Sequence, residues 1–296
     1  MPVWGFGTVL KTKNASITLN ERIFGYFPAS KYIILCPVKV NYSNFMVSRP
    51  QVPVDRVVYN TYVRVKNNLA FQKNEEGISI FWPLWATAYN LVYMLNANKN
   101  WFAKNIIVTS ASSKTSFCFA KEFGRRNNGT RLIGLTSKAN VDFVKSLKLY
   151  DVVLTYDNYK NLETDMKSLI VDVAGDRLLN SNLAKHLGDN RVQTVTVGMS
   201  HYEPNEKSLD ARPAEETSRN RTSLFFAPVW ILKRRDELGK EKAQELEEIA
   251  WNDTVQHLHN WIKFSKFKGP LTTEIVYQKA IAGKLDAKVG YIVSML

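Results

Sequence analysis

The sequence predicts an α/β protein with a doubly wound parallel sheet that follows a β-rich segment. Strand-like runs broken by glycine and proline occupy residues 1–70, and from about residue 83 strands alternate with helices. The later strands are almost entirely apolar, as expected when helices cover both faces of a parallel sheet. Strands joined by single helices are typical of parallel βαβ units.

The expected elements follow one another closely along the chain. The early strands lie in RIFGYFPASKYIILCPVKV and VDRVVYNTYVRV. The later strands are expected over 106–109, 131–136, 152–155, 168–173 and 192–198, with a short strand in SLFFAPVWIL and a last one in GYIVSM. Helices are expected over 84–96, 114–123, 139–147, 177–187, 236–263 and 273–284.

Residues 78–95 carry no charge and are just long enough to span a bilayer. Pro83, Thr87 and Asn90 interrupt this segment, so the sequence predicts a buried or interface helix and no membrane partner. The start of the chain does not resemble a signal peptide. With only two cysteines, both in apolar surroundings, the expected location is the cytoplasm.

The net charge of +13 and the pI of about 9.6 favour anionic partners. The densest basic stretch, 233–242, is interleaved with acidic residues, which is typical of a solvated helix face rather than a nucleic-acid-binding surface. Two cysteines cannot complete a structural zinc site, and no metal is expected.

A candidate phosphate site lies in NIIVTSASSKTSFCFAKEFG, residues 105–124, where a strand leads into a helix. In doubly wound sheets, ligands bind at the carboxyl ends of the strands. The turn contains no glycine, but backbone N–H groups and a helix N-terminus attract phosphate whatever the side chains are. An ordinary strand–loop–helix remains the alternative.

The second strand ends in LIGLTSKAN, without the acidic residue that usually binds the ribose of NAD. Hydroxyls and a lysine suit a 2′-phosphate better, so the sequence favours NADP over NAD. The alternative is that Ser137 caps a helix.

The order of several segments resembles the medium-chain dehydrogenase/reductase superfamily, in its zinc-free quinone oxidoreductase branch. ERIFGYFP, YNTYVRV, PLWATAYNLVYML, NIIVTSASSKTS, SLKLYDVVLTYD, VDVAG and TVTVG are similar to elements of that family. PVWGFG, IGLTS, LYDVVLTYD and FFAP resemble an uncharacterised branch known only as a domain of unknown function. The resemblance implies a Rossmann domain over 84–264 and a partial GroES-like domain over 1–83, completed by 265–296.

The resemblance also implies roles for particular residues. The nicotinamide would face Thr87, and Gly175 would let the backbone approach the cofactor. The pyrophosphate would contact Ser112, Ser113, Lys114 and Thr115, and the 2′-phosphate would contact Ser137 and Lys138. The carboxamide would contact the segment with Gly198, Met199 and His201. His201 is a candidate proton donor, with a structural role as its alternative. Tyr59 and Tyr62 are either donors in a cleft or core residues.

The resemblance implies an NADP(H)-dependent oxidoreductase that transfers a hydride to a carbonyl, a quinone or an activated alkene. The substrate would be a small molecule with a carbonyl or enone group. The resemblance is also compatible with a homodimer. A nucleotide-binding protein without catalysis and a basic nucleic-acid-binding protein remain alternatives. The motifs of serine hydrolases are absent from the sequence, so a hydrolase has no support.

Overall fold

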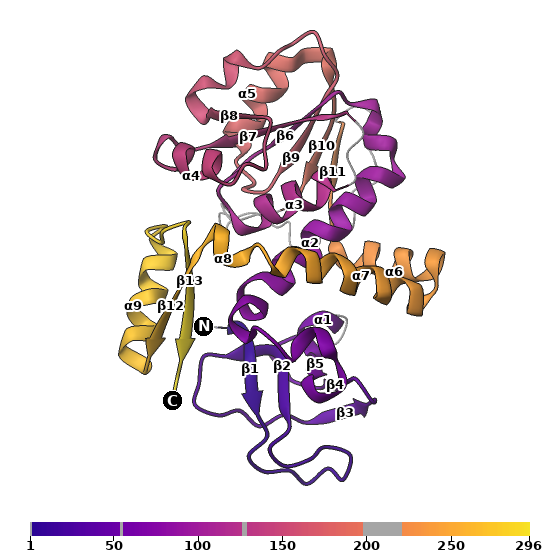
Figure 1. The fold of residues 1–296 in the computed structure, drawn as a ribbon, viewed down its shortest axis with the longest axis vertical. Helices are drawn as coiled ribbons and strands as arrows, with labels where there is room; N and C mark the ends of the chain where they lie inside the picture. The colour runs from indigo at the N-terminus through magenta and orange to yellow at the C-terminus, as the bar shows by residue number, and fades with distance from the viewer. Residues whose placement is uncertain (1, 54–55, 126–128, 198–220) are drawn as a thin grey trace. The chain divides into compact units, whose positions relative to one another are not determined.

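The structure is a computed structural model, and it describes residues 2–53, 56–125, 129–197 and 221–296 (Figure 1). The chain divides into two compact units. One unit comprises Met1–Pro83 with Glu247–Leu296, and the other comprises Leu84–Leu246.

The first unit takes in more of the C-terminal part of the chain than the sequence predicts, from Glu247 rather than residue 265. Aromatic packing accounts for this difference. The ring of Trp251 lies 5.1 Å from that of Trp82, and the ring of Trp261 lies 6.5 Å from that of Phe81. Both partners belong to the first unit, so these contacts join the residues after 247 to it.

In the second unit, six described strands form a parallel sheet with the order β11-β10-β9-β6-β7-β8. Its strands are β6 (Asn105–Val108), β7 (Arg131–Thr136), β8 (Val152–Thr155), β9 (Ser168–Asp172), β10 (Arg191–Thr196) and β11 (Thr222–Leu224). The chain runs outward from β6 through β7 to β8, and then returns to β9 on the other side of β6. The doubly wound sheet that the sequence predicts is therefore confirmed.

Helices pack on this sheet through apolar side chains. Leu183 and Leu187 of α5 (Arg177–Leu187) pack with Ile107 and Ile170 of the central strands. The other helices that lie wholly within this unit are α3 (Lys114–Gly124), α4 (Val141–Ser146) and α6 (Ala227–Leu238), with short turns η3 (Lys99–Phe102), η4 (Lys138–Asn140), η5 (Tyr156–Asn161) and η6 (Gly188–Asn190).

The first unit contains a five-stranded antiparallel sheet with the order β1-β2-β5-β4-β3. Its strands are β1 (Pro2–Thr8), β2 (Arg22–Pro28), β3 (Pro37–Val40), β4 (Asn44–Val47) and β5 (Thr61–Arg64). The core of this sheet includes Ile23, Phe45 and Tyr62. A glycine is required at Gly25, because a Cβ atom there would lie 2.4 Å from the ring of Tyr62.

The first unit also contains a parallel pair of strands, β12 (Lys263–Lys268) and β13 (Val289–Ser294). Its helices and turns are α1 (Val57–Asn60), η1 (Val65–Asn67), η2 (Leu69–Phe71), α8 (Leu258–Trp261) and α9 (Pro270–Ile281). The sequence predicts a continuous strand where α1 lies, and this expectation is wrong. The helix expected up to residue 263 ends at Trp261, just before β12 begins.

Two predicted helices differ most from their expected bounds. The apolar helix α2 (Glu75–Ala97) begins before Pro83 instead of after it, with Glu75 and Glu76 in its first turn. Acidic side chains there favour a helix N-terminus. The helix expected over 236–263 is divided, because α7 (Lys240–Val255) is separated from α6 by Gly239 at φ +80°.

Helix α2 is the one described helix that is long and apolar enough to cross a membrane by length and composition. Of its most apolar window, 56% is buried inside the structure. Trp85, Leu91 and Val92 are fully buried. This burial favours the core helix that the sequence predicts.

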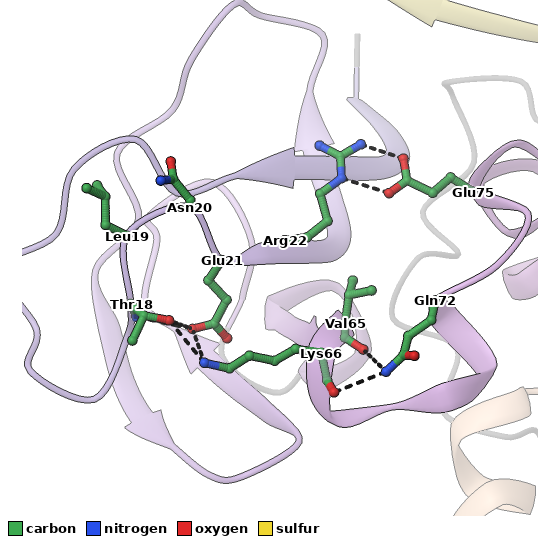
Figure 2. A pocket seen from close by; sticks show the side chains of 9 residues that line it. All are labelled: Thr18, Leu19, Asn20, Glu21, Arg22, Val65, Lys66, Gln72 and Glu75. Atoms are coloured by element: carbon green, nitrogen blue, oxygen red, sulfur yellow. Dashed lines mark hydrogen bonds and ion pairs between the residues drawn. The ribbon is translucent and has the colours of Figure 1, made fainter.

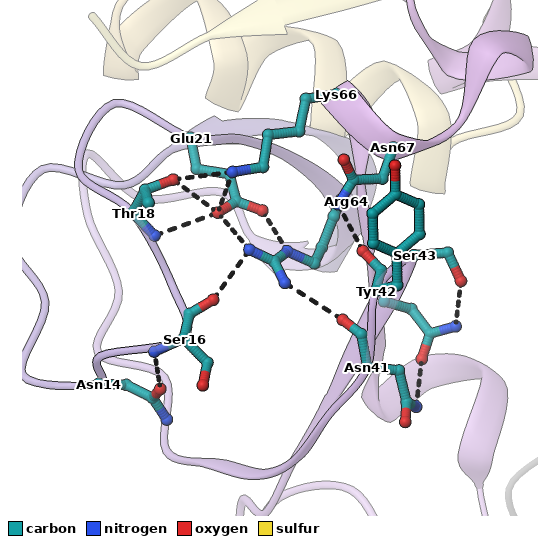
Figure 3. A network of polar contacts seen from close by, with 11 residues as sticks. Asn14, Ser16, Thr18, Glu21, Asn41, Tyr42, Ser43, Arg64, Lys66 and Asn67 are labelled. Atoms are coloured by element: carbon teal, nitrogen blue, oxygen red, sulfur yellow. Dashed lines mark hydrogen bonds and ion pairs between the residues drawn. The ribbon is translucent and has the colours of Figure 1, made fainter.

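A buried ion pair holds the sheet of the first unit together (Figure 3). Arg64 donates from Nε to Oε1 of Glu21 at 2.5 Å and from Nη2 to Oε2 at 2.9 Å. The same guanidinium donates to the carbonyl oxygens of Asn41 at 3.1 Å and Ser16 at 2.9 Å. The pKa of Glu21 falls to about 2, because the hydrogen bonds from Arg64 outweigh the opposing effect of burial.

Candidate functional site

The carboxyl ends of β6 and β9 are linked at the point where the strand order reverses. Thr109 follows β6, and its hydroxyl donates to Oδ1 of Asp172 at 2.8 Å. Asp172 is buried and also accepts from the backbone N–H of Gly175 at 3.1 Å and from Nδ2 of Asn180 at 2.7 Å. Gly175 adopts φ +73°, so the turn after β9 requires the left-handed conformation there.

The loop after β6 bends sharply without a glycine. Ser110 takes the left-handed conformation at φ +51°, which glycine adopts more readily. Its backbone N–H donates to the hydroxyl of Tyr156 at 3.2 Å. Ala111 is buried against Gly134 of β7, where an added Cβ atom would lie 2.9 Å from that of Ala111. Gly134 therefore leaves room for the side chain of Ala111 beneath the loop.

Replacing Ser110 with glycine should stabilise the protein by about 0.5–1 kcal/mol. The gain arises because glycine adopts the left-handed conformation without the steric cost that serine has there. The gain is partly offset because glycine also gives the unfolded chain more conformational entropy. Urea unfolding measures this difference, and Ser112→Gly serves as the control because Ser112 does not have a positive φ. Equal effects of the two glycines would contradict this account of Ser110.

Ser113 caps helix α3. Its Oγ accepts from the backbone N–H of Ser116 at 3.2 Å, and its hydroxyl donates to Oγ of Ser116 at 2.8 Å. The side chain of Ser113 is therefore occupied with the helix itself. Among the described residues, the backbone N–H groups of Ser112 and Thr115 make no hydrogen bond. Phosphate at this helix start would bind to the backbone and to the positive end of the helix dipole.

The structure brings the two predicted phosphate loops together through Asn140, which is not among the residues predicted from the sequence. Its Nδ2 donates to Oγ of Ser112 at 3.2 Å and to Oγ of Ser137 at 3.1 Å. Lys138 is exposed next to Ser137, while Lys114 and Thr115 are half-buried in the first turn of α3. An asparagine three residues after a serine is a common turn pattern, so its position in the sequence did not single it out.

One of the remaining predicted cofactor contacts lies on α2, and the others lie outside the described residues. Thr87 is half-buried on α2. Gly198, Met199 and His201 lie outside the described residues. Across the described ranges, no group of three or more His, Cys, Asp or Glu residues could hold a metal ion.

Tyr62 lies in the core of the first unit. Its hydroxyl donates to the carbonyl oxygen of Tyr26 at 2.7 Å and accepts from Nη1 of Arg49 at 3.2 Å. Burial raises the pKa of Tyr62. Tyr59 is 39% exposed, and its ring packs against that of Tyr26 at 5.1 Å. These contacts favour the core interpretation of Tyr62 over a role as a donor in a cleft.

The first unit also has an open polar cavity of about 520 Å³ (Figure 2). Each cation that lines it faces a carboxylate: Arg22 pairs with Glu75 at 2.5 Å, and Lys66 lies 3.5 Å from Glu21. The hydrogen bonds to Glu75 raise the pKa of Arg22. Glu21 also pairs with Arg64, so these charges do not balance. None of the lining residues lies at the carboxyl end of a parallel strand, however, and the loops after β6 and β7 are the better candidate site.

A six-stranded doubly wound sheet that follows a five-stranded antiparallel sheet is a Rossmann-type fold combined with a GroES-like fold. The chain belongs to the family described as protein of unknown function DUF2855, whose model matches residues 1–286. No curated protein matches the sequence closely enough to count as a relative.

Several solved structures of oxidoreductases resemble the chain in fold at low sequence identity. A candidate NADPH:quinone reductase from Mesorhizobium loti has a TM-score of 0.56 and 12% identity, over 98% of this chain and 76% of that one. YhdH of E. coli K-12, solved with bound NADPH, has a TM-score of 0.52 and 11% identity, over 98% and 80%. A mutant enoyl thioester reductase from Candida tropicalis has a TM-score of 0.52 and 17% identity, over 98% and 79%.

Proposed function

We propose that the protein is an NADPH-dependent oxidoreductase that reduces a carbonyl, a quinone or an activated alkene. The observation that carries this proposal is the pair of serine loops joined by Asn140 at the carboxyl edge of the doubly wound sheet. Ligands of such sheets bind at that edge. YhdH, which shares the fold, was solved with NADPH bound, and this supports the choice of cofactor.

Each part of the proposed site has a separate task. The free N–H groups of Ser112 and Thr115 and the start of α3 would bind phosphate oxygens. Ser137 and Lys138 would distinguish NADPH from NADH by contacting the 2′-phosphate. When bound, the cofactor supplies a hydride, and the reduced acceptor takes up a proton. Thr87 and the segment with Gly198, Met199 and His201 remain the proposed contacts of the nicotinamide end.

The test is a fluorescence titration with NADPH, followed by a screen of quinones, enones and aldehydes that monitors NADPH oxidation. We expect binding and turnover of at least one acceptor class. Binding without turnover of any acceptor would favour a nucleotide-binding protein without catalysis. RNA or DNA binding that falls steeply with salt and is unaffected by NADPH would instead favour the nucleic-acid alternative suggested by the charge of +13.

We further propose a cytoplasmic location and a homodimer. Cys36 is exposed and Cys118 is buried, and both are free thiols, which suits a reducing compartment. Light scattering of the purified protein tests the assembly, and a monomeric mass would contradict the dimer.

The protein should bind NADPH about tenfold or more tightly than NADH, because hydrogen bonds to a charged phosphate contribute more than those to a hydroxyl. Lys138→Glu should remove or reverse this preference by placing an anion beside the 2′-phosphate. Titration of both cofactors measures it, with Lys185→Glu on α5 as a charge-matched control. Equal affinities of the parent for the two cofactors would contradict the assignment.

A further inference from the structure

Asn140 uses both hydrogens of its side-chain amide on serine oxygens. One hydrogen is donated to Ser112, in the loop after β6, and the other to Ser137, in the loop after β7. The backbone N–H of Asn140 donates to the carbonyl oxygen of Ser137 at 2.9 Å, which fixes the turn that carries the amide. Two loops that are far apart in the sequence are thus held at one fixed spacing.

This arrangement determines what the two serine hydroxyls can do. A hydroxyl has one hydrogen to donate and two lone pairs that accept. Ser112 and Ser137 each accept from Asn140, and among the described residues neither donates its own hydrogen. Each hydroxyl therefore keeps its own hydrogen, which it can donate to an acceptor atom of a ligand. The NH₂ group of Asn140 cannot accept that hydrogen, because it is itself a donor.

The spacing of these donors suits a single phosphate group. Two oxygens that accept from one NH₂ group at ordinary hydrogen-bond lengths lie about 5 Å apart. Hydroxyls at that separation can both donate to different oxygens of one phosphate. The exposed Lys138, next to Ser137, adds positive charge on the same loop.

We propose that Ser112, Ser137 and Asn140 form one site for a phosphate monoester, with Asn140 as its positioning residue and the 2′-phosphate of NADPH as its ligand. The choice of NADPH rests on the function proposed above. Ser112 is thereby reassigned from the pyrophosphate, which the sequence suggests, to the 2′-phosphate. The pyrophosphate is left to the backbone N–H groups at the start of α3.

Titrating NADPH and NADH into the parent, Ser112→Ala and Asn140→Ala tests this assignment. Both variants should weaken NADPH about tenfold to a hundredfold and NADH less than about threefold, because only NADPH has the 2′-phosphate. If Ser112→Ala weakens the two cofactors equally, Ser112 contacts the pyrophosphate and the proposal is wrong. Unchanged NADPH affinity in Asn140→Ala would equally overturn it.

A second probe separates this proposal from the reductase activity. Adenosine 2′,5′-bisphosphate carries the 2′-phosphate but neither a nicotinamide nor a pyrophosphate, and calorimetry measures its binding directly. If the parent binds this probe and Asn140→Ala does not, the site is supported even where no acceptor is reduced. A parent that binds neither this probe nor NADPH overturns the site and the proposed function together.

Two further variants control for folding. Asn190→Ala removes an amide that donates to the carbonyl oxygen of Thr164 at 2.7 Å, just before β10 and so at the opposite edge of the sheet. It should leave the affinity for both probes unchanged.

Asn140→Asp keeps the shape of the side chain, but its carboxylate accepts the hydrogens of the two serine hydroxyls and adds a negative charge. This variant should lose binding of the bisphosphate while its thermal unfolding stays close to that of the parent.

Discussion

Ser113→Asp should weaken NADPH binding by about three orders of magnitude and leave the fold intact. Aspartate caps a helix as well as serine does, so the hydrogen bond from the backbone N–H of Ser116 should persist. Its negative charge would face the pyrophosphate proposed to bind at the start of α3. Two like charges about 4 Å apart repel by about 4 kcal/mol at the effective dielectric constant near a protein surface. Fluorescence titration measures the affinity, and thermal melting monitors the fold.

Ser113→Asn is the matched control for this prediction. Asparagine has the shape of aspartate and caps helices equally well, but it carries no charge. We expect Ser113→Asn to bind NADPH within about tenfold of the parent, because the side chain of Ser113 is already occupied by Ser116. If the aspartate variant binds as well as the asparagine variant, this loop does not hold phosphates and is an ordinary strand–loop–helix.

The sheet of the second unit could be predicted from the sequence because its signals are local. Apolar runs such as IIVT and RLIGLT are short and separated by amphipathic helices, and β6 and β7 lie within a residue or two of their expected bounds. The helix cap at Ser113 also follows from a local pattern, since serine at that position satisfies an N–H of the first turn. The two serine loops of the candidate site were therefore visible in the sequence.

Features that depend on contacts between distant segments could not be predicted in this way. The link between Ser112 and Ser137 requires the register of β6 against β7, which brings the two loops within reach of Asn140. No element is expected over residues 264–268, where most of strand β12 lies, and this strand pairs with β13 about 25 residues further along the chain.

The buried pair of Glu21 and Arg64 should make the stability of the first unit depend on pH (Figure 3). Hydrogen bonds from Arg64 lower the pKa of Glu21 from its ordinary value of 4.5 to about 2 in the folded protein. The stabilisation is therefore fully present above pH 4.5 and is lost as the pH falls towards 2. A shift of this size corresponds to about 3 kcal/mol.

Glu21→Gln should lower the free energy of unfolding by about 3–5 kcal/mol at pH 7, because it leaves the buried guanidinium of Arg64 without its carboxylate. The variant should also lose the part of the pH dependence between pH 4.5 and 2 that belongs to Glu21, since glutamine does not titrate. Urea unfolding at pH 7 and pH 3 measures both effects.

Glu75→Gln is the control, because it breaks the exposed pair of Glu75 and Arg22. The side chains of Arg22 and Glu75 are 40% and 42% exposed, and losing this pair should lower the free energy of unfolding by less than about 1 kcal/mol. Equal losses in the two variants would show that burial does not set the strength of the pair of Glu21 and Arg64.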